Sequence, residues 1–381
     1  MNKNKVFFNL INCGSEKGGM FQYALAFIED FVKKYSHRYD YTAIIDDKRY
    51  EDFLDNKIKI ILFKKVIPNK IRIKRILYVL SNFGLIPKGF GAMSYHKKIV
   101  SLNPDFLISL NQKPDNYYTN IPGIGVIHDA PRCWNSHVKK VHDYGYTIQF
   151  NSECFRILKS KIDVLVESYH AKESIKDKYN PKSKLIVLRY RPWFGKISNE
   201  KLRLDIVEKV KSNQKYVYYP STTHPVKNHK RLILGIELYN KFYKEKLSLI
   251  LTGPKDLFTE DLMKFAIKKI TCIHLGYVNE SEKIFIYKNS LGLAMPSLFN
   301  FGNIPVLESL ALGCKILTSK EPTLIETTSN LGIYVNPLHI ESIMSGLYRM
   351  LKLNYNSGDG EIFLNNISKT RMNSLDKISL N

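Results

Sequence analysis

The sequence predicts an α/β protein built from two consecutive units, each organised around a parallel sheet. Short runs of β-branched and aromatic residues recur between stretches of helical periodicity, a pattern typical of strands and helices that alternate along a parallel sheet. The chain has 381 residues, which is enough for two domains. Residues 181–200 are rich in proline, glycine and polar side chains, and a second series of strands follows them.

The expected elements can be read in order. In the first half, we expect strands at residues 5–11, 41–45, 58–63, 105–110, 123–128, 146–150 and 163–168. A first helix places one apolar stripe on the core, formed by Phe21, Ala24, Leu25, Ile28, Phe31 and Val32. After a linker near residues 181–200, we expect strands at 215–220, 246–253, 270–276, 291–297, 314–319 and 331–337, with a helix at 227–245. The polar segment after Leu353 shows only weak periodicity.

Composition and charge exclude several classes of protein. The chain is 44% hydrophobic and 24% charged, as in ordinary globular proteins, and it has no apolar run long enough to span a membrane. Its first residues are too polar for a signal peptide, and five scattered cysteines fit a reducing compartment. These features predict a cytoplasmic protein. The net charge of +23 would attract polyanions, but no motif of a nucleic-acid reader accompanies it.

The positive charge is concentrated in one segment. No acidic residue lies between Asp55 and Asp105, and we expect a helix that begins at Pro68 within this segment. Its apolar residues gather on one side, and basic residues lie mostly on the other, namely Lys70, Arg72, Lys74 and Arg75. A basic amphipathic helix suits the surface of an anionic membrane. The alternative is an ordinary domain helix with a solvated basic face.

Several kinds of chemistry lack their motifs. The sequence contains no Asp-x-Asp, no His-Glu-x-x-His, no Walker loop and no Gly-x-Ser-x-Gly, so metal, ATP and serine-hydrolase chemistry are not indicated. The loops after predicted strands are more informative. Gly18 and Gly19 precede the first helix, where a helix N-terminus favours an anion. Lys227 lies at a helix start, against the helix dipole, and Glu308 lies in an apolar segment, where an acid needs partners.

Four segments in the second half resemble one family. In order, these are YYPSTTHPVKNHKRLI, LILTGP, IHLGYVNESEKIFIYKNSLGLAMPS and FGNIPVLESLALGCKILTSKEPTLIE. They are similar to the C-terminal domain of GT-B fold retaining glycosyltransferases of the glycosyl transferases group 1, also called glycosyltransferase family 4. The resemblance implies two Rossmann-like domains with parallel sheets that face across a cleft. We expect an acceptor-side domain at 1–190, a nucleotide-sugar domain at 191–352, and a tail at 353–381 that packs back on the first domain.

The resemblance also assigns residues to roles. It implies that Glu308 binds the ribose hydroxyls, that Lys227 neutralises the diphosphate, and that His128 lies near the sugar and acceptor. Asn300 stands where the family has a glutamate that contacts the sugar, and Thr222 stands where it usually has an arginine. The expected catalytic residues are Lys227, His128 and Asn300. The expected donor site comprises Gly18, Gly19, Thr222, Lys227, Tyr277, Asn300, Phe301, Gly302, Asn303, Ile304 and Glu308.

The implied reaction moves a sugar from a nucleoside diphosphate sugar, UDP or GDP in type, to an acceptor hydroxyl with retention and without a metal or other cofactor. A composition rich in Lys, Ile, Asn and Tyr suggests a bacterial origin. The expected acceptor is a lipid-linked or surface glycan at the inner face of the cell membrane. One alternative keeps the fold and makes the protein an epimerase or phosphorylase. Another, based on Asn300 and Thr222, makes it a degenerate binding subunit of a glycosyltransferase complex.

Overall fold

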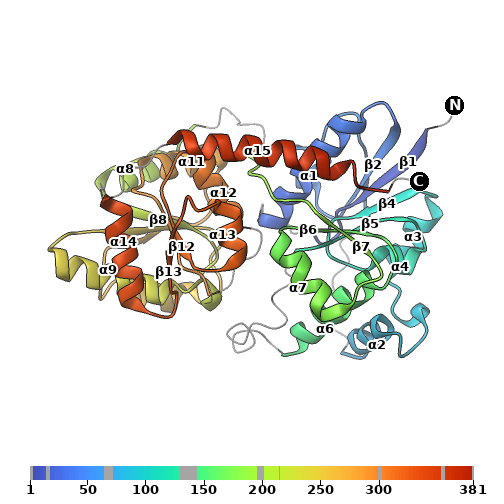
Figure 1. Ribbon diagram of the computed structural model, residues 1–381, viewed down its shortest axis with the longest axis horizontal. Coiled ribbons are helices and arrows are strands. Elements are labelled where there is room, and N and C mark those ends of the chain that lie inside the picture. The colour runs from blue at the N-terminus through green and yellow to red at the C-terminus, as the bar shows by residue number, and fades with distance from the viewer. Residues whose placement is uncertain are drawn as a thin grey trace. The chain divides into compact units, whose positions relative to one another are not determined.

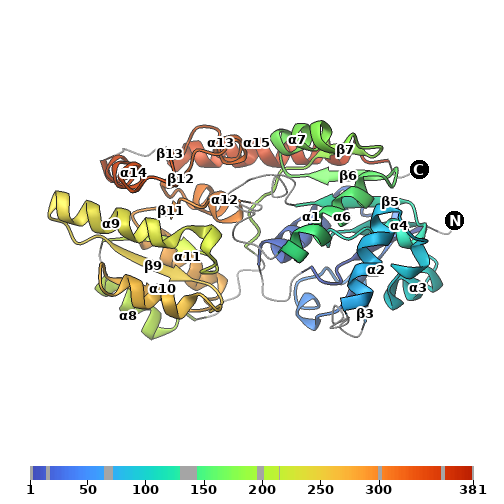
Figure 2. The same ribbon diagram turned by 90° about the horizontal axis from the view of Figure 1, so that it is seen from below.

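The protein is described by a computed structural model that covers residues 3–13, 18–63, 72–128, 144–194, 201–213, 215–298, 303–352 and 357–379. The chain divides into two compact units (Figure 1). Unit 1 comprises Met1–Tyr190 together with Lys369–Asn381, and unit 2 comprises Arg191–Ser368. Helices cover both faces of each sheet (Figure 2), as expected where strands and helices alternate.

Unit 1 contains a parallel sheet of seven strands within the described residues, in the order β3-β2-β1-β4-β5-β6-β7. The strands are β1 (Asn4–Asn9), β2 (Tyr39–Ile45), β3 (Lys59–Leu62), β4 (Phe106–Ser109), β5 (Gly123–Ile127), β6 (Asp163–Val166) and β7 (Lys184–Val187). The helices are α1 (Gly19–Tyr35), η1 (Lys48–Tyr50), α2 (Arg72–Phe83), η2 (Lys88–Phe90), α3 (Ser94–Ser101), α4 (Asp115–Thr119), α6 (Tyr144–Leu158) and α7 (Tyr169–Tyr179). Every residue of the predicted α1 stripe is buried.

Unit 2 contains a parallel sheet of six described strands, in the order β10-β9-β8-β11-β12-β13. The strands are β8 (Tyr216–Pro220), β9 (Ser248–Thr252), β10 (Cys272–His274), β11 (Leu293–Met295), β12 (Ile316–Ser319) and β13 (Ile333–Val335). The helices are α8 (Leu204–Ser212), η4 (Pro225–Lys227), α9 (His229–Tyr243), α10 (Thr259–Ala266), α11 (Glu280–Asn289), α12 (Ile304–Ala311), α13 (Pro322–Thr328) and α14 (Ile340–Lys352). The predicted α/β class with two parallel sheets is therefore confirmed.

The last helix, α15 (Ser357–Leu375), begins in unit 2, and its residues from Lys369 onward belong to unit 1. There, Arg371 is almost completely buried. Its Nε and Nη2 atoms donate to Oδ2 of Asp30 on α1, at 2.9 and 2.7 Å. The hydroxyl of Tyr35 donates to the carbonyl of Leu375 at 3.0 Å. The residues after 369 are thus an integral part of the packing of unit 1.

Three of the predicted elements differ in the structure. Residues 146–150, predicted as a strand, lie inside helix α6. The longer window explains this, because Phe150, Cys154 and Ile157 form a buried stripe at helical spacing. The segment predicted as a linker contains strand β7, and the weakly patterned tail forms α15. The predicted start of the basic helix at Pro68 lies outside the described residues.

No helix in the described part of the chain combines the length and the apolar character needed to cross a bilayer.

Candidate functional site

The sheet of unit 2 has a topological switch point between β8 and β11. From β8 the chain runs outward through β9 to β10, and it then returns to the other side of β8 to form β11, β12 and β13. In open parallel sheets, ligands bind at the carboxyl ends of the strands, where the strand order reverses. The loops that follow β8 and β11 flank this point. The first carries Lys227, and the second leads to helix α12, which contains Glu308.

Lys227 lies where the sequence predicts it, immediately before a helix. It ends the short helix η4, and Asn228, with a φ of 62°, connects it to α9. The side-chain amide of Asn228 donates to the carbonyl of Pro296, after β11, at 2.9 Å and to that of Pro337, after β13, at 2.7 Å. Asn228 therefore fixes the Lys227 loop, which follows β8, to the loops that follow β11 and β13 on the other side of the switch point.

A buried histidine lies next to this loop. The ring of His229 stacks on that of Tyr219, with centroids 4.5 Å apart. Burial first, and then the positive charge of Lys227, lower the pKa of His229 to about 3. Tyr219 in turn donates its hydroxyl hydrogen bond to the carbonyl of Lys227 at 3.1 Å. His229 is therefore neutral at physiological pH and packs on Tyr219, which binds the Lys227 carbonyl. Sequence reasoning missed this role.

Helix α12 starts at the other side of the switch point. Asn303 precedes it with a φ of 51° and is buried, and its amide donates to Oγ1 of Thr327 on α13 at 2.9 Å. Ile304, the first residue of α12, is also buried. The predicted donor contacts Asn300, Phe301 and Gly302 lie outside the described residues. What is described is the helix start, where Pro305 has no N–H and the N–H groups of Val306 and Leu307 donate to the carbonyl of Asn303, so the helix dipole is what favours an anion there.

Glu308 lies in the second turn of α12 and is buried. Its Oε1 atom is 2.6 Å from Nζ of Lys283, and its Oε2 atom accepts a hydrogen bond from the hydroxyl of Tyr287 at 3.2 Å. The protein itself thus provides partners for the acid that looks out of place in the sequence. Sequence reasoning missed both partners. The available signal was a lysine on the buried face of α11, which implies a buried anion nearby.

Two other predicted donor residues lie in separate loops of unit 2. Thr222 is half-buried in the loop after β8, and its carbonyl accepts a hydrogen bond from Ser221 at 3.0 Å. Tyr277 is exposed and follows edge strand β10, which β9 separates from β8. Its carbonyl accepts a hydrogen bond from Arg203 at 2.9 Å. The structure groups Thr222 with the Lys227 loop, whereas Tyr277 follows a strand farther from the switch point.

Unit 1 has its own switch point, between β1 and β4. Gly18 forms the N-cap of α1 and Gly19 is the first residue of that helix, which starts beyond the carboxyl end of β1. A Cβ atom built on Gly18 would meet no atom within 4 Å. Packing alone therefore does not demand a glycine at Gly18, and the space beside the backbone is open to a ligand.

His128 follows β5 at the same edge of this sheet and is buried. Its Nδ1 atom lies 2.7 Å from the hydroxyl of Tyr190, and its Nε2 atom lies 3.1 Å from the carbonyl of Leu110. Burial lowers the pKa of His128 to about 4. A carbonyl can only accept, so Nε2 carries the hydrogen and Nδ1 accepts from Tyr190. Both ring nitrogens are occupied within unit 1, as in a structural histidine.

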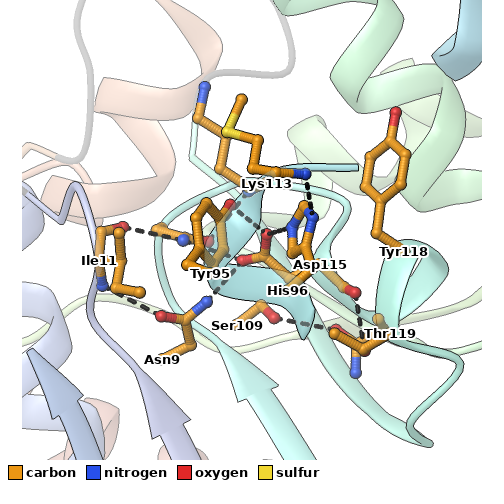
Figure 3. Close-up of polar contacts among 12 residues, drawn as sticks. Asn9, Ile11, Tyr95, His96, Ser109, Lys113, Asp115, Tyr118 and Thr119 are labelled. Atoms are coloured by element: carbon orange, nitrogen blue, oxygen red, sulfur yellow. Dashed lines mark hydrogen bonds and ion pairs between the residues drawn. The ribbon is translucent and has the colours of Figure 1, made fainter. Parts of the chain in front are cut away.

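A buried carboxylate organises the loops beside this switch point (Figure 3). The side chain of Asp115 is fully buried and accepts hydrogen bonds from Asn9 and Tyr95 at 2.7 Å and from His96 and Asn111 at 2.9 Å. Burial raises its pKa, but the hydrogen bonds outweigh burial and the pKa of Asp115 is lowered. These donors come from β1, α3 and the loop after β4, and no sequence motif connects them.

The network extends to the predicted site residues of unit 1. The amide of Asn111 also donates to the carbonyl of Ile11, in the loop that leads from β1 toward Gly18, at 2.9 Å. The backbone N–H of His128 donates to the side chain of Gln112 at 2.7 Å. The loops after β1, β4 and β5 are therefore joined by hydrogen bonds. Among the described residues of either unit, no group of His, Cys, Asp and Glu has a metal-binding arrangement.

Comparison with known proteins identifies the domain. Residues 201–357 match the family model described as Glycosyl transferases group 1. Unit 2 is a group 1 glycosyltransferase domain. A relative of this chain is the O-antigen chain mannosyltransferase RfbU of Salmonella typhimurium, which is 25% identical over 195 residues. That alignment covers 50% of this chain, and the chain spans only about half (51%) of the relative's length.

Solved structures extend the similarity to both units. The structure of Anabaena HepE in complex with UDP and glucose matches with a TM-score of 0.65 at 14% identity, over 98% of this chain and 100% of that one. WaaG, a glycosyltransferase involved in lipopolysaccharide biosynthesis, matches with a TM-score of 0.63 at 12% identity, over 96% and 95% of the two chains. At this identity the matches show the fold. They confirm that the group 1 domain is the second half of a GT-B architecture.

Proposed function

We propose that the protein transfers a sugar from a UDP- or GDP-type nucleotide sugar to a hydroxyl of a lipid-linked or surface glycan, in the assembly of a bacterial surface polysaccharide. The observation that carries the proposal is the switch point of unit 2. There Lys227 and the start of α12 flank β8 and β11, and Asn228 joins the two loops. A cation and a helix start offer binding groups for a diphosphate.

The proposed reaction proceeds with retention and without a metal. The bond between the sugar and the departing phosphate breaks while a bond to the acceptor oxygen forms, and the acceptor proton passes to the departing phosphate. Lys227 would stabilise the charge that develops on the phosphate, since fixed cations act most strongly where charge appears. Glu308 would accept hydrogen bonds from the ribose. A resemblance to O-antigen and lipopolysaccharide glycosyltransferases supports the acceptor class.

The first experiment is a thermal-shift assay of the full chain with UDP, GDP and their sugars, followed by release of nucleoside diphosphate from the stabilising donor. We expect one donor to stabilise the protein and both Lys227→Ala and Glu308→Ala to abolish the shift. Lys230→Ala is the matched control, because this lysine lies exposed on α9. No shift with any donor would contradict the proposal. If a nucleotide sugar binds but no nucleoside diphosphate is released with any acceptor fraction tested, the result would favour a degenerate binding subunit.

We further propose that unit 1 attaches to the anionic inner face of the cell membrane through α2. The residues of α2 that pack into the protein are Tyr78, Ser81 and Asn82. Asn82 donates to Ser152 at 3.1 Å and accepts from Tyr118 at 2.7 Å. At about 100° per residue, this polar face lies opposite the predicted apolar stripe. The helix therefore buries polar groups, whereas the described residues of its apolar stripe are half-buried or exposed, which departs from the usual pattern of a domain helix.

The exposed groups fit a membrane interface. Ile76 is 57% exposed, Leu85 is 70% exposed and Phe90 is 62% exposed, and the predicted basic residues Lys74 and Arg75 are exposed in the first turn of α2. Apolar side chains can enter the headgroup region while neighbouring cations attract anionic lipid. Of the other predicted contact residues, Lys70 lies outside the described residues, and only the backbone of Arg72 is described.

Flotation with phosphatidylglycerol-containing vesicles tests this attachment. We expect the wild-type chain to float, and the Leu85→Ser/Phe90→Ser double variant to remain in solution. A Leu257→Ser/Ile267→Ser variant is the control, because both of these residues are strongly exposed but lie in unit 2. Equal flotation of the two double variants, or binding to neutral phosphatidylcholine vesicles alone, would contradict the proposal.

A further inference from the structure

The partners of Glu308 form a more elaborate arrangement than a simple ion pair. Lys283 is 10% exposed in its side chain and Glu308 only 3%, and their charged atoms are 2.6 Å apart. A buried carboxylate without a partner would be costly, because transfer from water disfavours the charge. The ammonium of Lys283 thus allows Glu308 to remain an anion inside the protein.

Both donors to Glu308 come from the same face of α11. Lys283 and Tyr287 are four residues apart, which places them one helical turn from each other. Lys283 reaches Oε1, whereas the hydroxyl of Tyr287 lies 3.2 Å from Oε2 and 3.1 Å from the carbonyl of Pro305. Lys283 binds Oε1, and the single hydrogen of the Tyr287 hydroxyl is shared between Oε2 and the carbonyl of Pro305, so one helix orients the carboxylate.

Lys283 also lies between two acids. Its Nζ atom is 2.9 Å from Glu280, one turn earlier on α11. Burial lowers the pKa of Lys283, but the charges of Glu308 and Glu280 outweigh burial, and the pKa is raised. Tyr218 on β8 also interacts with these acids, and burial keeps it neutral. Lys283 therefore stays a cation throughout the physiological pH range.

We propose that Lys283 is a positioning residue of the donor site, which holds Glu308 charged and oriented so that the site prefers ribose over 2′-deoxyribose. This inference rests on the proposed function, in which Glu308 accepts hydrogen bonds from the ribose hydroxyls. A carboxylate offers about four acceptor positions, so the two donors on α11 do not exhaust it. Charge-assisted hydrogen bonds are strong and directional, so the orientation set by Lys283 decides the discrimination.

The test compares the binding of UDP and GDP with that of their 2′-deoxy analogues, by calorimetric titration of the full chain. For the base that binds, we expect the wild-type protein to prefer the ribonucleotide by roughly tenfold or more, the value of one hydrogen bond to a charged group. Lys283→Met, which keeps the length but removes the charge, should reduce that preference to about twofold or less. Lys283→Arg should retain part of it.

Two further variants keep the test decisive. Lys288→Met is the matched control, since this lysine is exposed on the same helix, and it should bind as the wild type does. Tyr287→Phe removes only the weaker donor and should show an intermediate preference if Lys283→Met fails to fold. The inference would be overturned if every folded variant preferred the ribonucleotide as strongly as the wild type does. It would also be overturned if the wild-type protein bound the ribonucleotide and its 2′-deoxy analogue equally. Binding of neither UDP nor GDP would instead overturn the proposed function.

Discussion

At the scale of single residues, two buried carboxylates of the two units are satisfied in different ways. Glu308 is paired with a buried lysine, whereas Asp115 accepts four hydrogen bonds from Asn9, Tyr95, His96 and Asn111. The Nδ1 atom of His96 accepts from the backbone of Met93 at 2.9 Å, so its Nε2 atom is the donor to Asp115. Asp115 is thus an anion held by neutral donors.

Replacing Asp115 by Asn should destabilise unit 1 strongly. The substitution keeps the volume, but it brings an amide N–H₂ among four groups that donate, so at least one buried donor loses its acceptor. We expect a cost of roughly 3 kcal/mol, measured by urea unfolding and by faster hydrogen exchange in β1 and β4. Asp177→Asn, on the exposed side of α7, should be neutral. Equal stabilities of the two variants would contradict this account of the network.

His128 should give unit 1 a measurable pH dependence. Its pKa in the folded protein is about 4, against an ordinary value of about 6.5. The unfolded chain therefore binds a proton at a pH where the folded chain does not. The contribution of His128 is complete above about pH 6.5, decreases as the pH falls, and is lost by about pH 4, for a total of about 3 kcal/mol.

The variant His128→Gln tests this assignment, because an amide can also donate to Leu110 and accept from Tyr190. Between about pH 6.5 and pH 4, the unfolding free energy of this variant should decrease less steeply than that of the wild type. The difference in slope corresponds to about one fewer proton taken up on unfolding. His229, with a pKa of about 3, supplies a similar dependence in unit 2 that the variant leaves in place. An unchanged slope would show that His128 is already charged in the folded protein.

The residue scale also shows what the sequence could predict of the site. Lys227 and Glu308 were identifiable because each charge occupies an energetically unfavourable position. Lys227 is a cation at a helix start, and Glu308 is an acid in an apolar segment. Lys283, Tyr287 and the donors to Asp115 were not, because they come from different elements and no fixed spacing connects them. His128 and Tyr190 likewise meet only through the fold.

At the scale of elements, the loop between β8 and α9 depends on one asparagine. Asn228 adopts a left-handed φ of 62° and binds two carbonyls. We expect Asn228→Gly to cost about 1 kcal/mol through the lost amide, and Asn228→Ala about 1 kcal/mol more, because alanine is strained at this φ. Both should weaken binding of UDP or GDP by displacing Lys227, as titration would show.

A second asparagine on the same helix provides the control. Asn240 donates to the carbonyl of Leu247 and accepts from its N–H, near the opposite end of α9. Asn240→Ala should therefore destabilise unit 2 by a similar amount without changing the affinity for nucleotide. If Asn228 and Asn240 variants weakened nucleotide binding equally, loss of stability and not displacement of Lys227 would be the cause.

Element prediction succeeded where apolar residues kept one period throughout. The stripe of α1 and the buried strands of both sheets are of this kind. It failed at residues 146–150, where four β-prone residues and a glutamine lie in a helix whose apolar stripe becomes visible only over a longer window. The sequence left open which face of α2 is buried, because periodicity shows that a helix has two faces but not which one packs on the protein.

At the scale of the whole molecule, unit 1 is assembled from two separate stretches of the chain. Removing residues 369–381 would take away Arg371 and leave Asp30 without its buried partner. We expect unit 1 to lose roughly 3 kcal/mol or more, seen as faster hydrogen exchange in α1 and β2, while peptides of the unit 2 sheet keep their protection. Arg371→Met should show the same pattern in a milder form. Uniform loss of protection in both units would contradict a local role.

The same discontinuity bears on how the protein is made. Domains commonly fold in the order in which they leave the ribosome, but here the first domain to emerge is among the last to be completed. The whole of unit 2 must be synthesised before residues 369–381 can reach α1. Until then, the carboxylate of Asp30 lacks the guanidinium of Arg371, and the nascent chain exposes a surface that chaperones can bind. Translation that terminated within α15, just before residue 369, would produce a protein with a complete unit 2 and an incomplete unit 1.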